Sequence, residues 1–179
     1  MNIIKLSGGL LVFLGLALPL CCFTKWKVSE YQEEVLVEKA LSENDYYALL
    51  EIEKIGLKKE LYPIDSKENQ VNQNILLHEE SVLPSDADTS HIILAAHSGS
   101  GWNAYFRDLY QLEVHDVISL YYQGRRWIYE IQEIEVQDKT GVLYLKEDYP
   151  HMISLITCTK NDSSSQTIYY GSLKKTQNL

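Results

Sequence analysis

The sequence has little cysteine, little proline and no excess of basic charge, and each shortage narrows its possible functions. The chain of 179 residues contains three Cys and four Pro, and its formal net charge is −9 with a pI near 5.0. So acidic a chain lacks the basic surface that binds nucleic acid, and it is repelled by anionic lipid head groups. Any attachment to a membrane must therefore depend on hydrophobic insertion.

Cysteine is scarce outside the N-terminus. Cys21 and Cys22 lie in an apolar N-terminal run, which leaves Cys158 alone in the rest of the chain. A lone thiol can form neither an internal disulfide nor, by itself, a thiolate zinc cage. His78 has no second His at helical spacing, and no Cys-x-x-Cys pair is present. We therefore expect no metal and no cofactor, and Cys158 is either a small core residue or a reactive thiol.

Two catalytic motifs are incomplete. Gly99-x-Gly101-x-x-Ala104 resembles a dinucleotide-binding turn, but the next strand lacks the acidic residue at its end and the surrounding sequence is rich in β-type segments. Ser98 and Ser100 both lack the Gly-x-Ser-x-Gly pattern of a serine hydrolase. The two glycines are better interpreted as a flexible turn.

The N-terminus carries the one long apolar run. Leu6 to Phe23 is uncharged and flanked by Lys5, Lys25 and Lys27, and at roughly 18 residues it is near the shortest length of a spanning helix. No small-x-small cleavage site follows it, so we favour an uncleaved anchor over a signal peptide. The predicted organisation is a membrane anchor at 1–24, a juxtamembrane helix or linker at 25–46 and a folded body at 47–179.

The body has the pattern of an all-β domain, with 13 Tyr in the chain, many of them in alternating runs. Asn103 to Leu112 predicts a short helix with Asn103 near its cap. We expect a β-barrel or sandwich with one or two short helices. The predicted strands are Ala48–Ile52 leading into Lys54–Leu57, Ile92–Ala96, the hairpin Val117–Tyr122 and Arg126–Val136 around Gln123-Gly124, Met152–Thr157 and Thr167–Tyr170.

Two chemically active residues follow predicted strands. Cys158 ends one apolar strand and His97 comes directly after another. Strand ends at a barrel rim can hold side chains rigidly and still expose them to substrate. An imidazolium beside a thiol stabilises the thiolate and can later protonate a leaving amine. A lone Cys on an apolar strand is more often a core residue, so this spacing alone leaves both interpretations open.

At these positions the chain resembles the sortases, the cysteine transpeptidases of Gram-positive cell surfaces. Ser154 to Cys158 is similar to the family's Thr-Leu-x-Thr-Cys strand, and Leu94 to His97 is similar to its Leu-Ala-Gly-His turn. Leu50 to Leu57 resembles the opening strand, and Tyr105 to Asp116 resembles a Phe-x-x-Leu-x-x-Leu-x-x-Gly-Asp segment with His115 in place of Gly. The resemblance covers about residues 47–173 in the right order.

This resemblance implies a closed eight-stranded β-barrel that binds a Leu-Pro-x-Thr-Gly-like sorting signal of secreted surface proteins. Cys158 would form the acyl-enzyme and His97 would protonate the leaving amine, with Ala96, Ser98 and Thr157 beside the substrate. An amine of a peptidoglycan precursor or of a pilin would resolve the thioester. The protein would then be a single-pass protein of the cell membrane, with its catalytic domain outside.

One position departs from the family pattern. Sortases carry an Arg on the strand after the Cys loop, and Gln166 stands there in this chain. A Gln amide can still donate hydrogen bonds to a developing oxyanion, but it brings no charge. Arg107, Arg125 and Arg126 are candidate substitutes.

Two other functions stay open at this stage. A thiol endopeptidase would use the same residues but transfer the acyl group mainly to water. A non-catalytic β-barrel that binds peptides could retain the thiol by descent.

Overall fold

The computed structural model describes residues 46–85 and 88–179. The predicted anchor at 1–24, and the predicted juxtamembrane segment except for residue 46, lie outside these residues. Within the described part of the chain, no helix is both long and apolar enough to cross a membrane.

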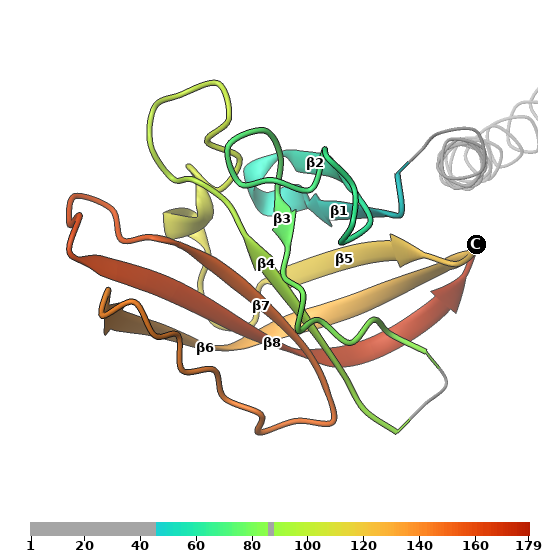
Figure 1. Cartoon of the computed structure of the whole chain (residues 1–179). Coiled ribbons are helices and arrows are strands. Elements are labelled where there is room, and N and C mark those ends of the chain that lie inside the picture. Colours follow the sequence, from blue (N-terminus) through green and yellow to red (C-terminus); the bar gives the residue numbers. More distant parts are fainter. Residues whose placement is uncertain (1–45, 86–87) are drawn as a thin grey trace, which may run out of the picture. The chain divides into compact units, whose positions relative to one another are not determined.

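Eight strands form one sheet (Figure 1). Two 3-10 helices, η1 (Glu53–Ile55) and η2 (Leu109–Gln111), accompany them. The all-β prediction with one or two short helices is therefore confirmed. The strands are β1 (Ala48–Ile52), β2 (Leu57–Leu61), β3 (Leu76–Leu77), β4 (Ser90–Ala95), β5 (Val117–Tyr122), β6 (Arg125–Asp138), β7 (His151–Cys158) and β8 (Ser165–Asn178).

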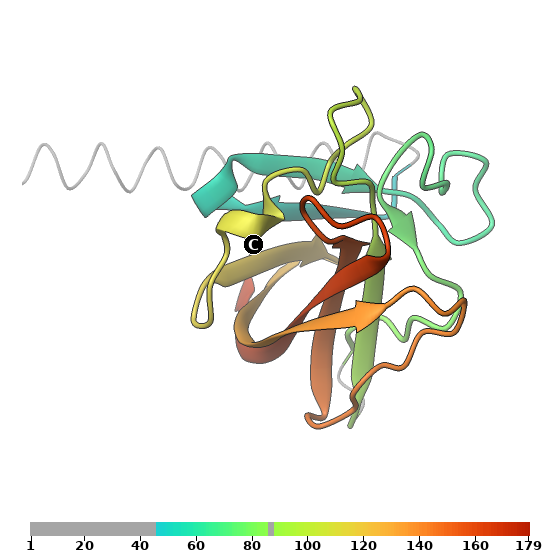
Figure 2. The same ribbon diagram turned by 90° about the vertical axis from the view of Figure 1, so that its left-hand side faces the viewer.

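The sheet curls into a nearly closed barrel (Figures 1 and 2). Its strand order is β2-β1-β5-β6-β8-β7-β4-β3, which puts β2 and β3 at the edges. The closed barrel that was expected is thus corrected to a nearly closed one. All neighbouring strands are antiparallel except β4 and β7, which run parallel. Because parallel neighbours end at the same edge of a sheet, β4 and β7 deliver their last residues to one rim.

Strand β7 buries both of its faces. Ile153 and Leu155 belong to the main core inside the barrel, whereas Met152 and Ile156 belong to a second apolar cluster on the other face. Leu143 and Leu145 of the β6–β7 connection pack against this second cluster. Burying each such side chain stabilises the fold by roughly 1.5–3 kcal/mol. Alternation along β7 therefore puts Cys158 in phase with Ile156, on the face outside the main core.

The β5–β6 hairpin follows its sequence signal. Gln123 and Gly124 form the turn with φ of 50° and 69°, the left-handed conformation that a two-residue hairpin requires at both positions. The structure places β5 at Val117–Tyr122, as expected, and extends β6 beyond the predicted range at both ends.

Two local predictions are wrong. The segment from Asn103 to Leu112 is mostly turns and contains only the short helix η2. The Asn103 side chain does not cap a helix, because its Nδ2 donates to the carbonyl oxygen of Asn72 at 3.0 Å. Lys54 to Leu57 is not one strand, since η1 ends there at Gly56 with φ of 63° and β2 begins at Leu57.

Candidate active site

The ends of β4 and β7 are fastened together beside Cys158. The parallel register aligns Ala95 with Ile156, so the residues that follow leave the sheet at the same rim. Thr157 Oγ1 donates to the Ala96 carbonyl oxygen at 2.8 Å, and Ser98 Oγ donates to the Cys158 carbonyl oxygen at 2.8 Å. These hydrogen bonds hold the backbone on both sides of the rim and so restrict the positions of His97 and Cys158.

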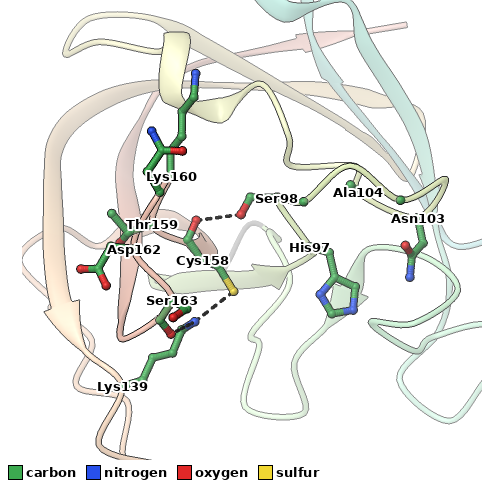
Figure 3. Close-up of a pocket in the computed structure, with 13 residues that line it drawn as sticks. His97, Ser98, Asn103, Ala104, Lys139, Cys158, Thr159, Lys160, Asp162 and Ser163 are labelled. Carbon is green, nitrogen blue, oxygen red and sulfur yellow. Dashed lines mark hydrogen bonds between the residues drawn. The ribbon is translucent and has the colours of Figure 1, made fainter.

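His97 and Cys158 line one open pocket of about 800 Å³ (Figure 3). Both residues are partly exposed. Figure 3 shows the Cys158 sulfur and the His97 ring pointing into this pocket, with one ring nitrogen on the side of Cys158 and the other on the opposite side. The rim of the barrel thus combines a reachable thiol with a reachable imidazole.

Asn72 fixes the orientation of the His97 ring. Its Oδ1 lies 3.0 Å from His97 Nε2. An amide oxygen only accepts hydrogen bonds, so this contact requires a proton on Nε2. In the neutral ring the lone pair then lies on Nδ1, which leaves Nδ1 to take up or release a proton on the other side.

The loop that carries Asn72 is held by two buried Asn side chains. Asn69 Nδ2 donates to the Leu77 carbonyl oxygen at 2.9 Å, and its Oδ1 accepts from the Leu77 amide at 2.7 Å. Asn74 Nδ2 donates to the Glu68 carbonyl oxygen at 3.0 Å. Because buried amides are costly to leave unpaired, these contacts define one loop conformation, and that conformation presents Asn72 to His97.

The residue opposite Cys158 on the neighbouring strand is uncharged. Gln166 of β8 lies directly opposite Cys158 in the antiparallel register. Directly opposed residues project from the same face of a sheet. Gln166 is partly exposed, but it is not among the residues that line the pocket shared by Cys158 and His97.

The positively charged group at the thiol comes from the β6–β7 connection. Lys139 Nζ lies 3.1 Å from Cys158 Sγ and donates to the Ser163 carbonyl oxygen at 3.0 Å (Figure 3). The Lys139 amide also donates to the Ser164 carbonyl oxygen at 2.8 Å. Both the backbone and the side chain of Lys139 are therefore attached to the loop that follows Cys158.

Asp162 shapes that loop. Its Oδ1 accepts from the Ser164 amide at 2.9 Å and from Ser164 Oγ at 2.6 Å, and its Oδ2 accepts from Ser165 Oγ at 2.6 Å. The hydrogen bonds from Ser164 and Ser165, with a smaller contribution from the Lys139 charge, lower the pKa of Asp162 to about 2. The carboxylate is thus ionised at neutral pH and occupied within its own loop.

Comparison with known protein families matches residues 50–174 to the sortase domain. The chain belongs to the sortase family. Among curated proteins, no significant match is found.

Solved sortase structures have the same fold. The sortase D5 transpeptidase of Clostridium perfringens is 27% identical with a TM-score of 0.59, over 82% of this chain and 95% of that one. Sortase A of Listeria monocytogenes is 18% identical with a TM-score of 0.60, over 76% and 92%. Sortase E1 of Streptomyces coelicolor, solved with a tripeptide in its active site, is 21% identical with a TM-score of 0.58, over 75% and 91%.

The arginines expected to compensate for Gln166 in this sortase have other contacts. Arg125 and Arg126 start β6 at the β5–β6 turn and pair with the C-terminal end of β8, far along that strand from Gln166. They therefore cannot reach Cys158. Arg107 lies nearer, because it shares a small cavity with Cys158. Its Nε and Nη2 donate to the carbonyl oxygens of Gly99 and Gly101 at 3.1 and 2.7 Å.

The residues expected beside the substrate fall into two groups. Ser98 lines the pocket. Ala96 and Thr157 are buried, with 4% and 7% of their surfaces exposed, and fasten the two strand ends. Substrate contact at these three positions stays a prediction. Within residues 46–85 and 88–179, no cluster of three or more His, Cys, Asp or Glu side chains is arranged to hold a metal ion.

Sequence reasoning missed Asn72 and Lys139. Neither is adjacent in sequence to Cys158 or His97, and each arrives on a connection between strands. Lys139 reaches the thiol through the register of β6 on β8, in which Asp138 at the end of β6 pairs with Ser165, next to Gln166, and no local sequence pattern signals that register. Asn72 had no signal either, since its loop is defined by side-chain hydrogen bonds.

Proposed function

We propose that this sortase is a transpeptidase that cleaves a sorting-signal peptide through a thioester on Cys158 and transfers the acyl group to an amine. The observation that carries the proposal is the convergence of Cys158 and His97 on one open pocket at the fastened ends of β4 and β7. A thiol and an imidazole at one rigid rim are the two groups that acyl transfer requires.

The proposed chemistry has two steps. The Cys158 thiolate attacks the scissile carbonyl carbon, and the C–N bond breaks as His97 donates a proton to the leaving amine. The incoming amine then attacks the thioester carbon while His97 takes up a proton from its nitrogen, and the Cys158 sulfur leaves as thiolate. The energy of the acyl bond is conserved in the thioester, which suits transfer better than hydrolysis.

The site's surroundings give the other groups their proposed roles. Asn72 holds the His97 ring so that Nδ1 performs both proton transfers. Gln166 donates a hydrogen bond to the oxyanion from the strand opposite Cys158. An open pocket of about 800 Å³ is large enough for several residues of an extended peptide. The tripeptide in the active site of sortase E1 supports a peptide ligand of this kind.

The substrate and the cellular location are part of the proposal. The acyl donor is a Leu-Pro-x-Thr-Gly-like signal of a secreted surface protein, and the acceptor is an amine of a peptidoglycan precursor or of a pilin. The uncharged run at 6–23 anchors the protein in the cell membrane, with the catalytic domain outside.

Product analysis with a sorting-signal peptide tests the proposal. We expect wild-type protein to release the C-terminal fragment and, with an added amine, to yield the amine-coupled N-terminal fragment. Cys158→Ala should yield neither. Hydrolysis product alone at saturating amine would identify a thiol endopeptidase instead. Peptide binding without any cleavage would identify a non-catalytic module and refute the proposal.

A further inference from the structure

The contact between Lys139 and Cys158 is not explained by the thiol and imidazole pair. Lys139 Nζ lies 3.1 Å from Cys158 Sγ, within the range of a hydrogen bond to sulfur. A lysine ammonium donates three hydrogen bonds and accepts none, so the sulfur must be the acceptor. A thiolate accepts such a bond far better than a neutral thiol does, because a charge-assisted hydrogen bond favours the ionised partner.

We propose that Lys139 is a catalytic residue that holds Cys158 as the thiolate nucleophile. Its role in catalysis rests on the proposed function, but its effect on the thiol can be measured without a peptide substrate. Lys139 comes directly after the end of β6, where the preceding residue, Asp138, pairs with Ser165 of β8. The sheet register therefore places the start of the β6–β7 connection beside the thiol.

The second hydrogen bond of Lys139 goes to a neutral acceptor. Nζ donates to the Ser163 carbonyl oxygen at 3.0 Å, and a backbone carbonyl is a neutral acceptor. The nearby Asp162 carboxylate accepts its hydrogen bonds from Ser164 and Ser165, and the Lys139 charge makes only a smaller contribution to the lowered pKa of Asp162. Asp162 thus builds the turn that offers the Ser163 carbonyl, and the ammonium stays directed at the sulfur.

Other charged or titratable groups line the cavities that contain Cys158, and each has a contact of its own. His97 after β4 is bonded to Asn72. Arg107 holds the carbonyl oxygens of Gly99 and Gly101. Lys160, in the loop after Cys158, lies over the ring of Tyr110. Among the cations that line the pocket in the described part of the chain, Lys139 has the hydrogen bond to the sulfur.

Lys139 transfers no proton in the proposed cycle. In the attack, negative charge moves from the Cys158 sulfur to the carbonyl oxygen as the C–S bond forms, and it returns to sulfur when that bond breaks. The proton of the leaving amine comes from His97, so the ammonium acts only by its charge and its hydrogen bond. No further reactant is needed.

Alkylation of Cys158 by iodoacetamide tests the inference in the full-length protein in detergent. The rate is measured from pH 5 to pH 10, with the modification at Cys158 quantified by peptide mass spectrometry. Removing an adjacent positive charge should make the thiolate form at higher pH. We expect Lys139→Met, and likewise Lys139→Gln, to raise the midpoint of the profile by about one pH unit. Because Lys139 is exposed, we expect its variants to fold, and melting curves check this.

Three variants separate the effect of the Lys139–Cys158 contact from the effect of the overall positive charge around the pocket. Lys139→Arg keeps the positive charge, so its midpoint should differ from the wild-type value by less than half of the shift seen in Lys139→Met. Lys160→Met removes an equal charge that does not touch the sulfur, so it should shift the midpoint by less than half as much. Adding Gln166→Arg to Lys139→Met introduces a cation on the strand opposite Cys158 and should restore the midpoint toward the wild-type value.

The outcomes distinguish this inference from the proposed function. Unchanged profiles in Lys139→Met and Lys139→Gln would overturn the role of Lys139, even if wild-type protein forms a thioester with a sorting-signal peptide. An equal shift of the midpoint in Lys160→Met would also overturn it, because the shift would then come from the overall positive charge around the pocket and not from the contact between Lys139 and the sulfur. The expected shift without any thioester in wild-type protein would leave the Lys139 contact established and refute the proposed function.

Discussion

The two ends of β6 both carry positively charged side chains, but the charges are held in different ways. At the β5–β6 turn, Arg126 Nη2 lies 3.1 Å from Glu53 Oε1 and 3.9 Å from Glu51 Oε2. At the other end, Lys139 is held by the Ser163 carbonyl oxygen and the Cys158 sulfur. A carboxylate neutralises a cation, whereas a carbonyl only positions it.

Arg107 follows the pattern of Lys139. Its guanidinium is bonded to the carbonyl oxygens of Gly99 and Gly101. The turn that contains Gly99 and Gly101 was interpreted from the sequence as flexible, but these two hydrogen bonds from Arg107 restrict its conformation. The turn end of the barrel thus pairs its positive charge with carboxylates, while the pocket end holds Lys139 and Arg107 on carbonyl oxygens, where their charge can stabilise an anion formed during a reaction.

The largest effect should come from removing the imidazole at the pocket end. We expect His97→Ala to lower the rate of amine-coupled product formation by about 10²- to 10⁴-fold, because it removes the general acid and base. His97 is partly exposed, so the melting temperature should stay close to the wild-type value. Steady-state kinetics with a sorting-signal peptide measures the loss. A variant that retains more than about a tenth of the rate would separate His97 from the chemistry.

A smaller effect should follow from releasing the ring. Asn72→Ala removes the acceptor that fixes Nε2, and we expect kcat to fall about 10-fold with KM little changed, because a misoriented base transfers protons less often. Asn72→Asp, which keeps an acceptor, should lose less and should also shift the pH dependence of kcat, because it adds a charge beside the ring. An equal increase in KM for both variants, with kcat unchanged, would assign Asn72 to peptide binding instead.

A substitution at the turn end of β6 should lower the stability of the fold and leave the reactivity of Cys158 unchanged. Arg126→Met removes the contacts to Glu53 and Glu51 and the hydrogen bond to Ser119 Oγ at 3.1 Å. We expect a loss of roughly 0.5–2 kcal/mol in the free energy of unfolding, measured by urea denaturation. The alkylation profile of Cys158 should be unchanged. A shifted profile would show that the charge of Arg126 affects the ionisation of Cys158, and the two ends of β6 would then not be independent.

The smallest expected effect concerns His91, away from both ends of β6. Burial lowers the pKa of His91, opposed by a weaker effect of the Glu147 carboxylate. The unfolded chain therefore binds a proton at His91 more readily than the folded one, and stability should decrease as the pH falls from about 7.5 through the ordinary His range near 6.5. In His91→Gln, urea unfolding at pH 7.5 and 5.5 should show a smaller difference. An undiminished difference would assign the pH dependence to other groups.

The part of the fold that could be predicted from the sequence is the part in which local pattern and tertiary position agree. The β5–β6 hairpin has alternating residues and a turn that suits positive φ. Strand β7 is mostly apolar, and both of its faces are covered. Strand β3 has only two residues, Leu76 and Leu77, which is too short for any periodic signal. Its hydrogen bonds with Asn69 form only in the folded loop.

The residues of the candidate site also differ in whether local sequence pattern reveals them. Cys158 and His97 were predicted because each follows an apolar strand and lies in a family motif. Lys139 and Asn72 were not, because the register of β6 on β8 and the fold of the 62–75 loop bring them to the pocket. The sequence offered Arg125 and Arg126 as the source of positive charge, yet their place on β6 puts them at the turn end. Residue type alone could not locate the cation.

Trapping the acyl-enzyme tests the central claim most directly. Full-length protein is incubated with a sorting-signal peptide, quenched in acid and analysed by intact mass and peptide mapping. We expect an adduct with the mass of the N-terminal peptide fragment on Cys158, which is discharged by hydroxylamine or an added amine and is missing in Cys158→Ala. Peptide cleavage that persists in Cys158→Ala, or an adduct on another residue, would contradict the account.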